Sequence, residues 1–241
     1  MRAVILAAGL GRRLGGAAEE APKILLRFAG RSLLERHLTQ LGAIGVDEIT
    51  LGTGHGAALI EAELERLDAT NVELVHNPDY REGSIVTLAT LGEAMTRGGD
   101  ILLMDGDVLY DRRMLQWLLA SGNNNLFLMD REVEPGEEPM KLAVKAGHPV
   151  DFRKTLEREH AFYGESVGFF RFDEAVAREL GEAARRIIAA GRRGDYMEET
   201  IRDVLLASAG DRFGFVDISG LPWIEIDFAE DLARAASEIL P

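Results

Sequence analysis

The chain has 241 residues, of which 46% are hydrophobic and 28% are charged, and this composition suits one folded domain of ordinary size. Its formal net charge of −14 and its lack of cysteine disfavour nucleic-acid partners, anionic membrane surfaces, disulfide frameworks and thiolate metal sites. No apolar run is long enough to span a bilayer, and we expect a cytoplasmic protein.

The first half of the chain alternates between predicted strands and helices. Ala3-Val4-Ile5-Leu6 is an apolar run typical of a strand buried on both faces of a parallel sheet. Ser32-Leu33-Leu34-Glu35 is a capping-box pattern that opens a helix. Strands and helices then follow in turn, at 49–51, 57–67, 72–75, 84–95 and 101–104. The alternation predicts an α/β fold with a Rossmann-like, mixed but mostly parallel sheet and helices on both faces.

The regular alternation stops after Asp130. Residues 132–139 are acidic and rich in proline, which predicts an exposed loop. Short strands and two helices follow, at 141–144, 150–153, 166–172, 173–190 and 196–208, and the chain closes with strands at 213–216 and 223–226 and a helix. We expect a single domain over 1–241 with a small α+β insert or lid at about 131–210.

A glycine-rich segment directly follows the first predicted strand. It reads Leu6-Ala7-Ala8-Gly9-Leu10-Gly11-Arg12-Arg13-Leu14-Gly15, and Pro22-Lys23 comes shortly after it. Small residues let backbone N–H groups approach an anion, and the arginines and the lysine add positive charge. We interpret the segment as a polyphosphate site, although such a connector can also join a strand to a helix without a ligand.

The spacing of these glycines argues against two common classes of nucleotide-binding protein. The pattern Gly9-x-Gly11-x-x-x-Gly15 differs from the dinucleotide fingerprint, and no acidic residue follows the second predicted strand to contact a ribose. The Gly-Lys-Ser/Thr ending of phosphate-loop ATPases is missing as well. A nicotinamide dehydrogenase and an ATPase of that type are therefore disfavoured. The five histidines lack metal-site spacing, and we expect structural roles for them.

Two further motifs place carboxylates at predicted strand ends. Asp105 and Asp107 come at the end of a buried strand, and such oxygen ligands suit Mg²⁺ when substrate phosphates complete its coordination. Glu225 and Asp227 share one face of a later strand, because side chains alternate with a period of two. Each motif alone also fits a turn or a helix cap. A triphosphate site, however, needs a cradle, a cation and carboxylates from separate strand ends.

Together these motifs resemble the nucleotidyltransferase superfamily that activates sugar 1-phosphates and alcohol phosphates. Its hallmark is Leu-Ala-Ala-Gly-x-Gly-x-Arg followed by Pro-Lys, and residues 6–13 and 22–23 match it. The ending Trp223-Ile224-Glu225-Ile226-Asp227, with Asp231-Leu232, looks most like the bacterial phosphocholine and inositol 1-phosphate cytidylyltransferases. The resemblance runs nearly end to end. It implies a Mg²⁺-dependent enzyme that transfers CMP from CTP to a small phosphorylated alcohol or phosphonate and releases pyrophosphate.

The resemblance also implies roles for individual residues. Lys23, Arg13 and Asp107 would be catalytic, and Asp107 and Asp227 would hold Mg²⁺. Nucleotide contacts are expected from Leu6, Ala7, Ala8, Gly9, Gly11, Arg12, Asn77, Ser84 and Asp105. Acceptor contacts are expected from the insert and its neighbours, at Tyr80, Lys141, Lys154, Glu165, Glu198 and Trp223. A lysine would neutralise the acceptor's phosphate, and Glu165 or Glu198 would pair with an amine or hydroxyl.

The identity of the acceptor stays open at this point. Phosphocholine enzymes often carry Asn near the position of Gly83, and this chain does not. A quaternary ammonium favours an aromatic cage, for which the candidates are Tyr80, Tyr163, Tyr196 and Trp223. Phosphocholine, inositol 1-phosphate, aminoethylphosphonate and related compounds are all compatible with the sequence.

Two alternative functions also remain open. The same fold serves uridylyl- and guanylyltransferases that act on a sugar 1-phosphate, and a relative that has lost catalysis would still bind nucleotide. The presence of Asp107, Asp227 and Lys23 together argues against the inactive protein. The expected partners are CTP and a small phosphorylated acceptor, with neither nucleic acid nor membrane, and the chain would act as a monomer or homodimer.

Overall fold

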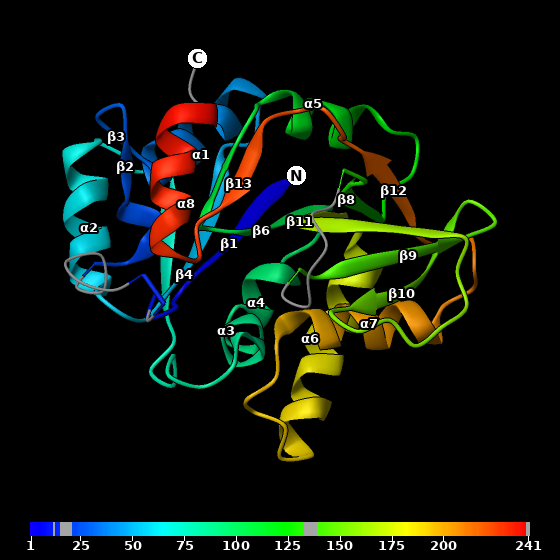
Figure 1. The fold of residues 1–241 in the computed structure, drawn as a ribbon. Helices are drawn as coiled ribbons and strands as arrows, with labels where there is room; N and C mark the ends of the chain where they lie inside the picture. The colour runs from blue at the N-terminus through cyan, green and yellow to red at the C-terminus, as the bar shows by residue number, and fades with distance from the viewer. Residues whose placement is uncertain (12, 15–20, 133–138, 240–241) are drawn as a thin grey trace.

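The structure is a computed structural model that describes residues 1–11, 13–14, 21–132 and 139–239 (Figure 1). In chain order its elements are β1 (Arg2–Ala7), η2 (Lys23–Leu25), β2 (Arg27–Phe28), β3 (Arg31–Ser32), α1 (Leu33–Ala43), β4 (Glu48–Thr53), α2 (Ala57–Arg66), β5 (Val72–His76), α3 (Ser84–Thr90), α4 (Gly92–Met95), β6 (Ile101–Asp105), β7 (Val108–Tyr110), α5 (Arg113–Ala120), β8 (Leu126–Asp130), β9 (Lys141–Lys145), β10 (His148–Arg153), β11 (Phe162–Phe172), α6 (Glu174–Ala189), α7 (Met197–Ala207), β12 (Gly214–Asp217), β13 (Trp223–Glu225), α8 (Ala229–Arg234) and η3 (Ala235–Ile239).

One mixed sheet organises the molecule. Its main strands run in the order β10-β9-β11-β6-β1-β4-β5, and β6, β1, β4 and β5 are parallel neighbours. Strand β11 pairs antiparallel with β6 and also with β8, which in turn pairs with β12. Because Leu6 lies opposite Asp105 in this register, the loops that follow β1 and β6 leave the sheet side by side. Ligands of open α/β sheets bind at such an edge.

Helices cover both faces of the sheet (Figure 1). Side chains of β1 alternate between two hydrophobic cores, as those of a strand buried on both faces do. Ala3 and Ile5 pack in the core that includes residues of α1, α2 and α5. Val4 and Leu6 pack in the core that includes residues of α3, α4, α6 and α7. The predicted α/β fold, with a mostly parallel sheet between two helical layers, is confirmed.

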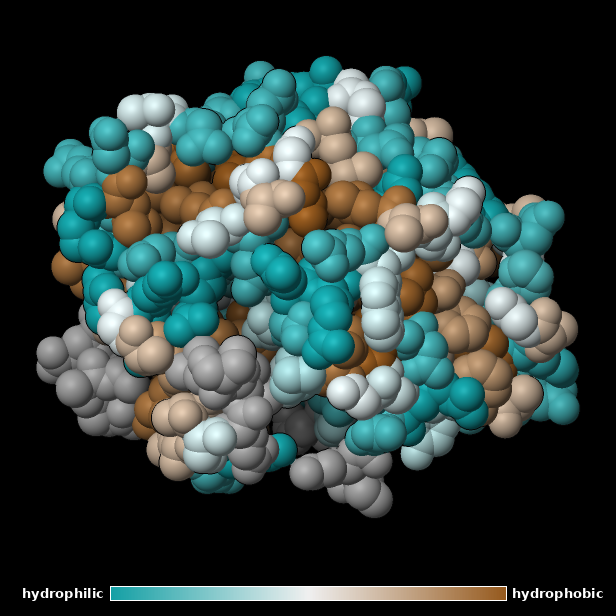
Figure 2. Space-filling view, turned by 90° about the horizontal axis from the view of Figure 1, so that it is seen from above, coloured by the Kyte–Doolittle hydropathy of each residue, from teal (hydrophilic) through white to brown (hydrophobic). Residues whose placement is uncertain are grey.

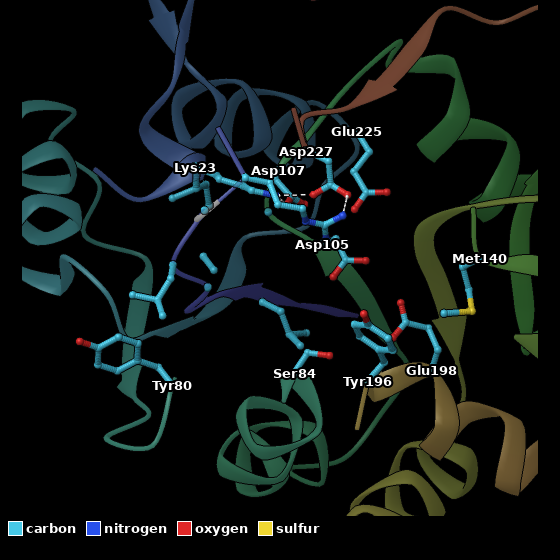
Figure 3. A pocket seen from close by; sticks show the side chains of 18 of the residues that line it. Lys23, Tyr80, Ser84, Asp105, Asp107, Met140, Tyr196, Glu198, Glu225 and Asp227 are labelled. Atoms are coloured by element: carbon cyan, nitrogen blue, oxygen red, sulfur yellow. Dashed lines mark hydrogen bonds and ion pairs between the residues drawn. The ribbon is translucent and has the colours of Figure 1, made fainter. Parts of the chain in front are cut away.

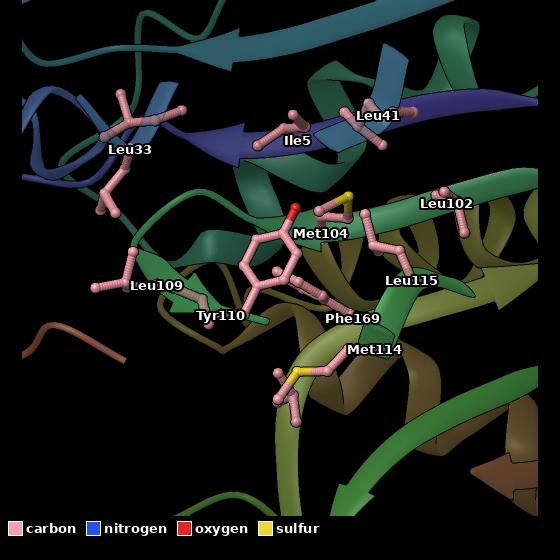
Figure 4. Packing of buried hydrophobic residues seen from close by; sticks show 14 of the residues in the cluster. Ile5, Leu33, Leu41, Leu102, Met104, Leu109, Tyr110, Met114, Leu115 and Phe169 are labelled. Carbon is pink, nitrogen blue, oxygen red and sulfur yellow. The ribbon is translucent and has the colours of Figure 1, made fainter. Parts of the chain in front are cut away.

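Aromatic side chains fill parts of both cores. In the first core Tyr110 packs edge-to-face on Phe169, with ring centroids 4.6 Å apart, beside Met104 and Met114 (Figure 4). In the second core Phe127 contacts a group of further phenylalanine rings, at 152, 170, 172 and 213. Edge-to-face packing of this kind adds to the free energy gained by burying the rings.

Most predicted elements of the first half lie within one or two residues of their expected positions. The Ser32 hydroxyl accepts a hydrogen bond from the Glu35 N–H at 3.1 Å, and so caps α1 as predicted. The helix predicted over 84–95 is divided into α3 and α4 at Leu91. Strands β7 and β8 are not predicted by the pattern, because short apolar runs without alternation do not distinguish a strand from a buried helix.

The second half of the chain joins the same sheet. Strand β11 is 11 residues long, and it pairs with β9 near its start and with β6 near its end. Helix α7 packs against β10 and α6. The acceptor-binding role expected for residues 131–210 stays a prediction, and its residues 133–138 lie outside the described part of the chain.

The surface carries many charged side chains. On the face seen from above, polar residues surround smaller apolar patches (Figure 2). This distribution agrees with the 28% of charged residues in the composition. Within the described ranges, none of the helices has both the length and the apolar character required to cross a membrane.

A buried histidine fixes the turn that follows β6. His37 of α1 is fully buried, and its Nε2 lies 3.2 Å from the carbonyl oxygen of Gly106. Its Nδ1 lies 3.4 Å from the hydroxyl of Tyr110. A neutral ring that donates from Nε2 and accepts at Nδ1 satisfies both contacts. Burial lowers the pKa of His37 from 6.5 to about 4, so the ring stays neutral at ordinary pH.

This burial predicts a pH-dependent stability. Between the unfolded pKa of 6.5 and the folded pKa of about 4, unfolded His37 takes up a proton that the folded state does not. Stability should therefore fall as the pH falls through this window. We expect His37→Gln to remove about 2 kcal/mol of the stability difference between pH ~7 and pH ~5, measured by urea unfolding.

The matched control for this experiment is His76→Gln, which changes an exposed histidine at the end of β5. It should leave the pH dependence close to that of the wild type. An equal change in both variants would show that burial of His37 is not responsible.

Candidate active site

A cavity of about 410 Å³ opens where β1 and β6 end. Its walls come from the loop after β1, from η2, from the turn after β6, from the end of β13 and from the segments around the starts of α3 and α7 (Figure 3). The predicted site residues that line it are Leu6, Ala7, Gly9, Gly11, Arg13, Lys23, Tyr80, Ser84, Asp105, Asp107, Lys154, Glu198 and Asp227.

The loop after β1 closes against Lys23. Gly11 has a φ of +61°, a left-handed conformation that favours glycine. A Cβ atom at this position would lie 3.3 Å from Cγ of Lys23, so the absent side chain lets the lysine stem pass close to the loop. Arg12, a predicted nucleotide contact in the same loop, lies outside the described residues.

Lys23 joins carboxylates from two distant segments. Its Nζ lies 2.8 Å from Oδ2 of Asp107 and 2.6 Å from Oδ1 of Asp227 (Figure 3). Arg13 reaches Oδ2 of Asp227 at 3.4 Å, and its guanidinium lies 5.1 Å from the ring centroid of Phe228. The predicted convergence of Lys23, Arg13, Asp107 and Asp227 at one place is thus present in the structure.

Three carboxylates converge beside the ammonium group. Asp107, Glu225 and Asp227 each offer an oxygen, and these oxygens lie within 4.8 Å of one another. Figure 3 shows Glu225 and Asp227 side by side at the end of β13. Carboxylate oxygens are the donors that hard cations such as Mg²⁺ prefer. The donor set therefore fits a divalent cation.

Backbone hydrogen bonds fix the segments that carry these carboxylates. The Gly106 N–H donates to the Leu6 carbonyl at 3.0 Å, and the Ile226 N–H donates to the Asp107 carbonyl at 3.0 Å. Oδ2 of Asp231 accepts the N–H groups of Asp227 and Phe228 at 2.9 and 2.7 Å. The strand ends and the start of α8 thus hold the acidic residues near one another in spite of their repulsion.

The charges perturb several pKa values. Burial lowers the pKa of Lys23, but the charges of Asp107 and Asp227 outweigh it, and the net pKa is raised above the ordinary lysine value. Burial, together with the charges of neighbouring carboxylates, raises the pKa of Asp105 well above its usual range. Burial also raises the pKa of Glu198 to about 7. Perturbed carboxyl groups in a cleft are characteristic of functional sites.

Asp105 rests on a bulge in β11. The register of β11 against β8 shifts between Ser166 and Phe170, and Gly168 within this stretch has a φ of +77°. A Cβ atom at Gly168 would lie only 2.2 Å from Oδ2 of Asp105. The glycine thus makes room for the carboxylate at the bottom of the cavity.

The opposite wall is formed by the segments around the starts of α3 and α7. Figure 3 shows Tyr80, Ser84, Tyr196 and Glu198 across the cavity from the acidic cluster, which consists of Asp107, Glu225 and Asp227. The Glu198 side chain is partly buried, and its Oε2 is buried without a hydrogen-bond partner among the described residues. Nζ of Lys154 lies 5.1 Å from the ring centroid of Tyr196.

Hydrogen bonds join these two segments tightly. The Gly83 N–H donates to the Arg193 carbonyl at 2.9 Å, and the Met197 N–H donates to the Ser84 hydroxyl at 2.8 Å. A Cβ atom at Gly83 would lie 2.0 Å from the carbonyl oxygen of Asp195, so a side chain at Gly83 would separate the two segments.

Five predicted contacts are not among the described residues that line the cavity. The Ala8 carbonyl accepts the His55 N–H at 3.2 Å. Asn77 is buried; its Nδ2 donates a hydrogen bond to the Thr87 hydroxyl, and its Oδ1 accepts one from the Asp79 N–H. Nζ of Lys141 donates to the Lys154 carbonyl at 2.9 Å, and Glu165 lies opposite Lys141 in the sheet. The fifth residue is Trp223, whose Nε1 donates to Asp130 at 2.8 Å.

Some residues at the site are not predicted as functional from the sequence. The two-residue period of the strand places Glu225 on the same face as Asp227, and this is the signal that identifies Glu225 as a third possible ligand. Asp231 and His37 hold the backbone beside the carboxylates. Asp231 accepts N–H groups only three and four residues before it, which is a local helix-capping contact. The partners of His37 lie in distant segments, so no local pattern indicates its contacts.

A family model described as a MobA-like NTP transferase domain matches residues 3–166. The chain belongs to this family. The predicted membership of the nucleotidyltransferases is confirmed.

Similar proteins agree with this assignment of the NTP transferase domain. CMP-5'-(3-aminopropyl)phosphonate synthase of Streptomyces rubellomurinus is 29% identical over 100% of this chain and 39% of that protein. The bifunctional IPC transferase and DIPP synthase of Rubrobacter xylanophilus is 27% identical over 99% of this chain and 52% of that protein. The chain thus spans about half or less of these relatives. The inositol-1-phosphate CTP transferase of T. maritima has the same fold, with a TM-score of 0.75 and 18% identity. The match covers 100% of this chain and 98% of that protein.

The contact between Gly168 and Asp105 leads to a stability prediction. In Gly168→Ala the new methyl group would press on Oδ2 of Asp105 in addition to straining the backbone. A matched control is Gly147→Ala, where φ is +84° and no atom lies within 4 Å of the added Cβ. We expect the control to cost about 1–2 kcal/mol of unfolding free energy from backbone strain alone.

Gly168→Ala should cost at least about 1 kcal/mol more than the control, because it adds a steric clash in a packed region. Urea unfolding of both variants measures the difference. Equal losses in the two proteins would show that Asp105 does not depend on the bulge.

Proposed function

We propose that this protein transfers CMP from CTP to a small phosphorylated alcohol or phosphonate and releases pyrophosphate. The observation that carries the proposal is the position of Lys23 between Asp107 and Asp227, in the cavity that the glycine-rich loop also lines. Two of the similar proteins are named for CMP or CTP and for a phosphonate or an inositol phosphate, and these names support the choice of nucleotide and acceptor.

The nucleotide would bind on the side of the loop after β1. Gly9 and Gly11 line the cavity there, and glycines allow a phosphate chain to approach the backbone closely. Arg13 and Lys23 would bring positive charge to the triphosphate. The proposal places the α-phosphorus of CTP near Lys23, where the loop, η2 and the acidic cluster meet.

The acidic cluster would hold Mg²⁺ through Asp107 and Asp227, with Glu225 as a further donor. A bound Mg²⁺ would supply positive charge to phosphate oxygens during the reaction. Asp105 lies deeper, against the bulge of β11, and it would remain protonated more readily than an exposed aspartate because its pKa is raised by burial and by neighbouring carboxylates.

The chemistry would consist of one displacement at phosphorus. An oxygen of the acceptor's phosphate or phosphonate forms a bond to the α-phosphorus of CTP, and the bond to the oxygen that bridges to the β-phosphorus breaks. Pyrophosphate leaves with that electron pair. Because the acceptor is already an anion, the residues of the chain mainly position two repelling reactants and neutralise the charge that grows on the leaving oxygen.

The acceptor would occupy the opposite side of the cavity. Tyr80, Tyr196, Lys154 and Glu198 line this side. A second recess of about 330 Å³ adjoins it and shares Met140, Lys154 and Tyr196 with the first cavity. The proposed insert at 131–210 contributes all of these shared residues, which supports its assignment as the acceptor-binding part of the domain.

We further propose that the acceptor carries an ammonium group. Glu198 presents a carboxylate to the cavity, and its Oε2 is buried without a partner among the described residues. A buried carboxylate oxygen of this kind is costly unless a donor or a cation satisfies it. Tyr196 is half exposed beside it, and the Lys154 ammonium group 5.1 Å from its ring centroid shows that this aromatic side chain accommodates a cation. An aminoalkyl phosphonate or phosphocholine would place a cation at this position.

The assignment of Asp107 predicts a large loss of activity on substitution. Asp107→Asn keeps the shape of the side chain but removes its charge, and it should lower kcat by about 10²–10³-fold, as the loss of one electrostatic group at an active site does. Pyrophosphate release from CTP, measured with a panel of acceptors, tests this. Thermal unfolding confirms that the variant is folded.

The matched control is Asp111→Asn, which changes a nearby aspartate that bonds the Arg113 N–H at 2.8 Å and does not line the cavity. It should leave turnover near that of the wild type. A folded Asp107→Asn protein with wild-type turnover would remove Asp107 from the catalytic machinery. In the wild type, a preference for UTP or GTP with a hexose 1-phosphate would overturn the choice of CTP.

The role of Glu198 predicts a change in acceptor preference. Glu198→Gln should raise KM for 2-aminoethylphosphonate by about tenfold or more, because a hydrogen bond to a charged partner is lost. KM for inositol 1-phosphate, which has a neutral ring, should change little. Steady-state kinetics with both acceptors measure the two effects separately.

Asp203→Asn is the matched control for Glu198, since Asp203 is an exposed acid on the same helix and pairs with Arg186. It should alter neither KM. An equal rise in both KM values for Glu198→Gln would indicate a general disturbance of the cavity rather than recognition of an ammonium group.

A further inference from the structure

Lys23 lies where the carboxylate oxygens of the acidic cluster converge. Its ammonium nitrogen is 2.8 Å from one oxygen of Asp107 and 2.6 Å from one oxygen of Asp227. Both residues belong to the group of three carboxylates whose ligand oxygens lie within 4.8 Å of one another. The lysine side chain is only 16% exposed, so water contributes little to its solvation.

A divalent cation held by the acidic cluster would share the carboxylates of Asp107 and Asp227 with this ammonium group. Mg²⁺ binds carboxylate oxygens at about 2.0–2.1 Å and demands a nearly octahedral arrangement. A cation bound to the oxygens that Lys23 now contacts would lie within a few ångströms of Nζ, where two positive charges repel strongly. Both cannot be held by these two oxygens at once.

We propose that Lys23 is a resident cation of the metal site, which competes with the divalent cation for Asp107 and Asp227 until nucleotide phosphates draw the ammonium group away. The inference rests on the proposed function, because it takes the loop after β1 as the phosphate site. It adds an order of events: the nucleotide-free protein excludes the metal, and the metal enters together with the nucleotide.

The path of the Lys23 side chain supports this exchange. Its stem passes Gly11, where an added Cβ would lie 3.3 Å from Cγ of the lysine. The lysine side chain therefore lies next to the same loop that would hold the phosphates. A triphosphate bound there competes with Asp107 and Asp227 for the ammonium group. When the ammonium group moves to the triphosphate, two carboxylate oxygens become free to bind a cation.

The experiment measures Mn²⁺ binding to the nucleotide-free protein, from the electron paramagnetic resonance signal of free Mn²⁺. The wild type should bind Mn²⁺ weakly. Lys23→Met removes the competing charge and keeps a long side chain, and it should bind Mn²⁺ at least about tenfold more tightly, since a cation next to the site is lost. Lys23→Met/Asp107→Asn should lose this gain.

The matched control is Arg13→Met. It removes a positive charge that contacts Asp227 at 3.4 Å, from a position next to the bridge that Lys23 makes between Asp107 and Asp227. Its effect on Mn²⁺ affinity should be clearly smaller than that of Lys23→Met. Equal gains in the two variants would mean that overall charge, rather than occupation of the site, governs binding, and would overturn the proposal.

Two other results would overturn it as well: tight Mn²⁺ binding by the nucleotide-free wild type, or no gain in Lys23→Met. Circular dichroism checks that each variant is folded, and Lys23→Gln serves as a second neutral replacement. None of these measurements requires turnover. Failure of the proposed function would instead appear as an absence of CTP-dependent pyrophosphate release by the wild type with every acceptor tested.

Discussion

Lys23 Nζ contacts carboxylates that stand 84 and 204 residues further along the chain. The acidic cluster could not assemble without compensating charge, since carboxylates held this closely repel one another. The ammonium group and the nearby guanidinium of Arg13 provide that charge in the protein itself. The fold keeps these repelling groups in place in spite of their repulsion.

The mixed sheet and the turns at its edge position these charged groups. Parallel pairing of β1 with β6 brings the glycine-rich loop next to Asp105, and the pairing of β7 with β13 brings Asp107 next to Asp227. Strand β11 extends the main sheet further, because it pairs with β6 at one end and β9 at the other. The cavity is therefore built on the main sheet together with the separate two-stranded sheet of β7 and β13.

The sequence predicts those features that arise from local patterns. The apolar run before the glycine-rich loop, the carboxylates at strand ends and the two-residue period of Glu225 and Asp227 predict that these residues meet at the edge of a parallel sheet, and they line one cavity there. It does not predict the antiparallel return of β11, the buried contact of His37 with Gly106 or the use of Trp223 to bond Asp130. Each of these depends on partners that tertiary packing alone brings together.

The seam between Gly83–Ser84 and the segment that leads into α7, held by the Gly83–Arg193 and Met197–Ser84 hydrogen bonds, has a consequence for the diversification of this domain. Any side chain there would collide with the Asp195 carbonyl at 2.0 Å, so this position is closed to variation while the seam persists. Under the proposed function, substrate preference can change more readily through Tyr196 and Glu198, whose side chains line the cavity. A mutant library intended to broaden substrate range should therefore randomise the beginning of α7 and leave the glycine untouched.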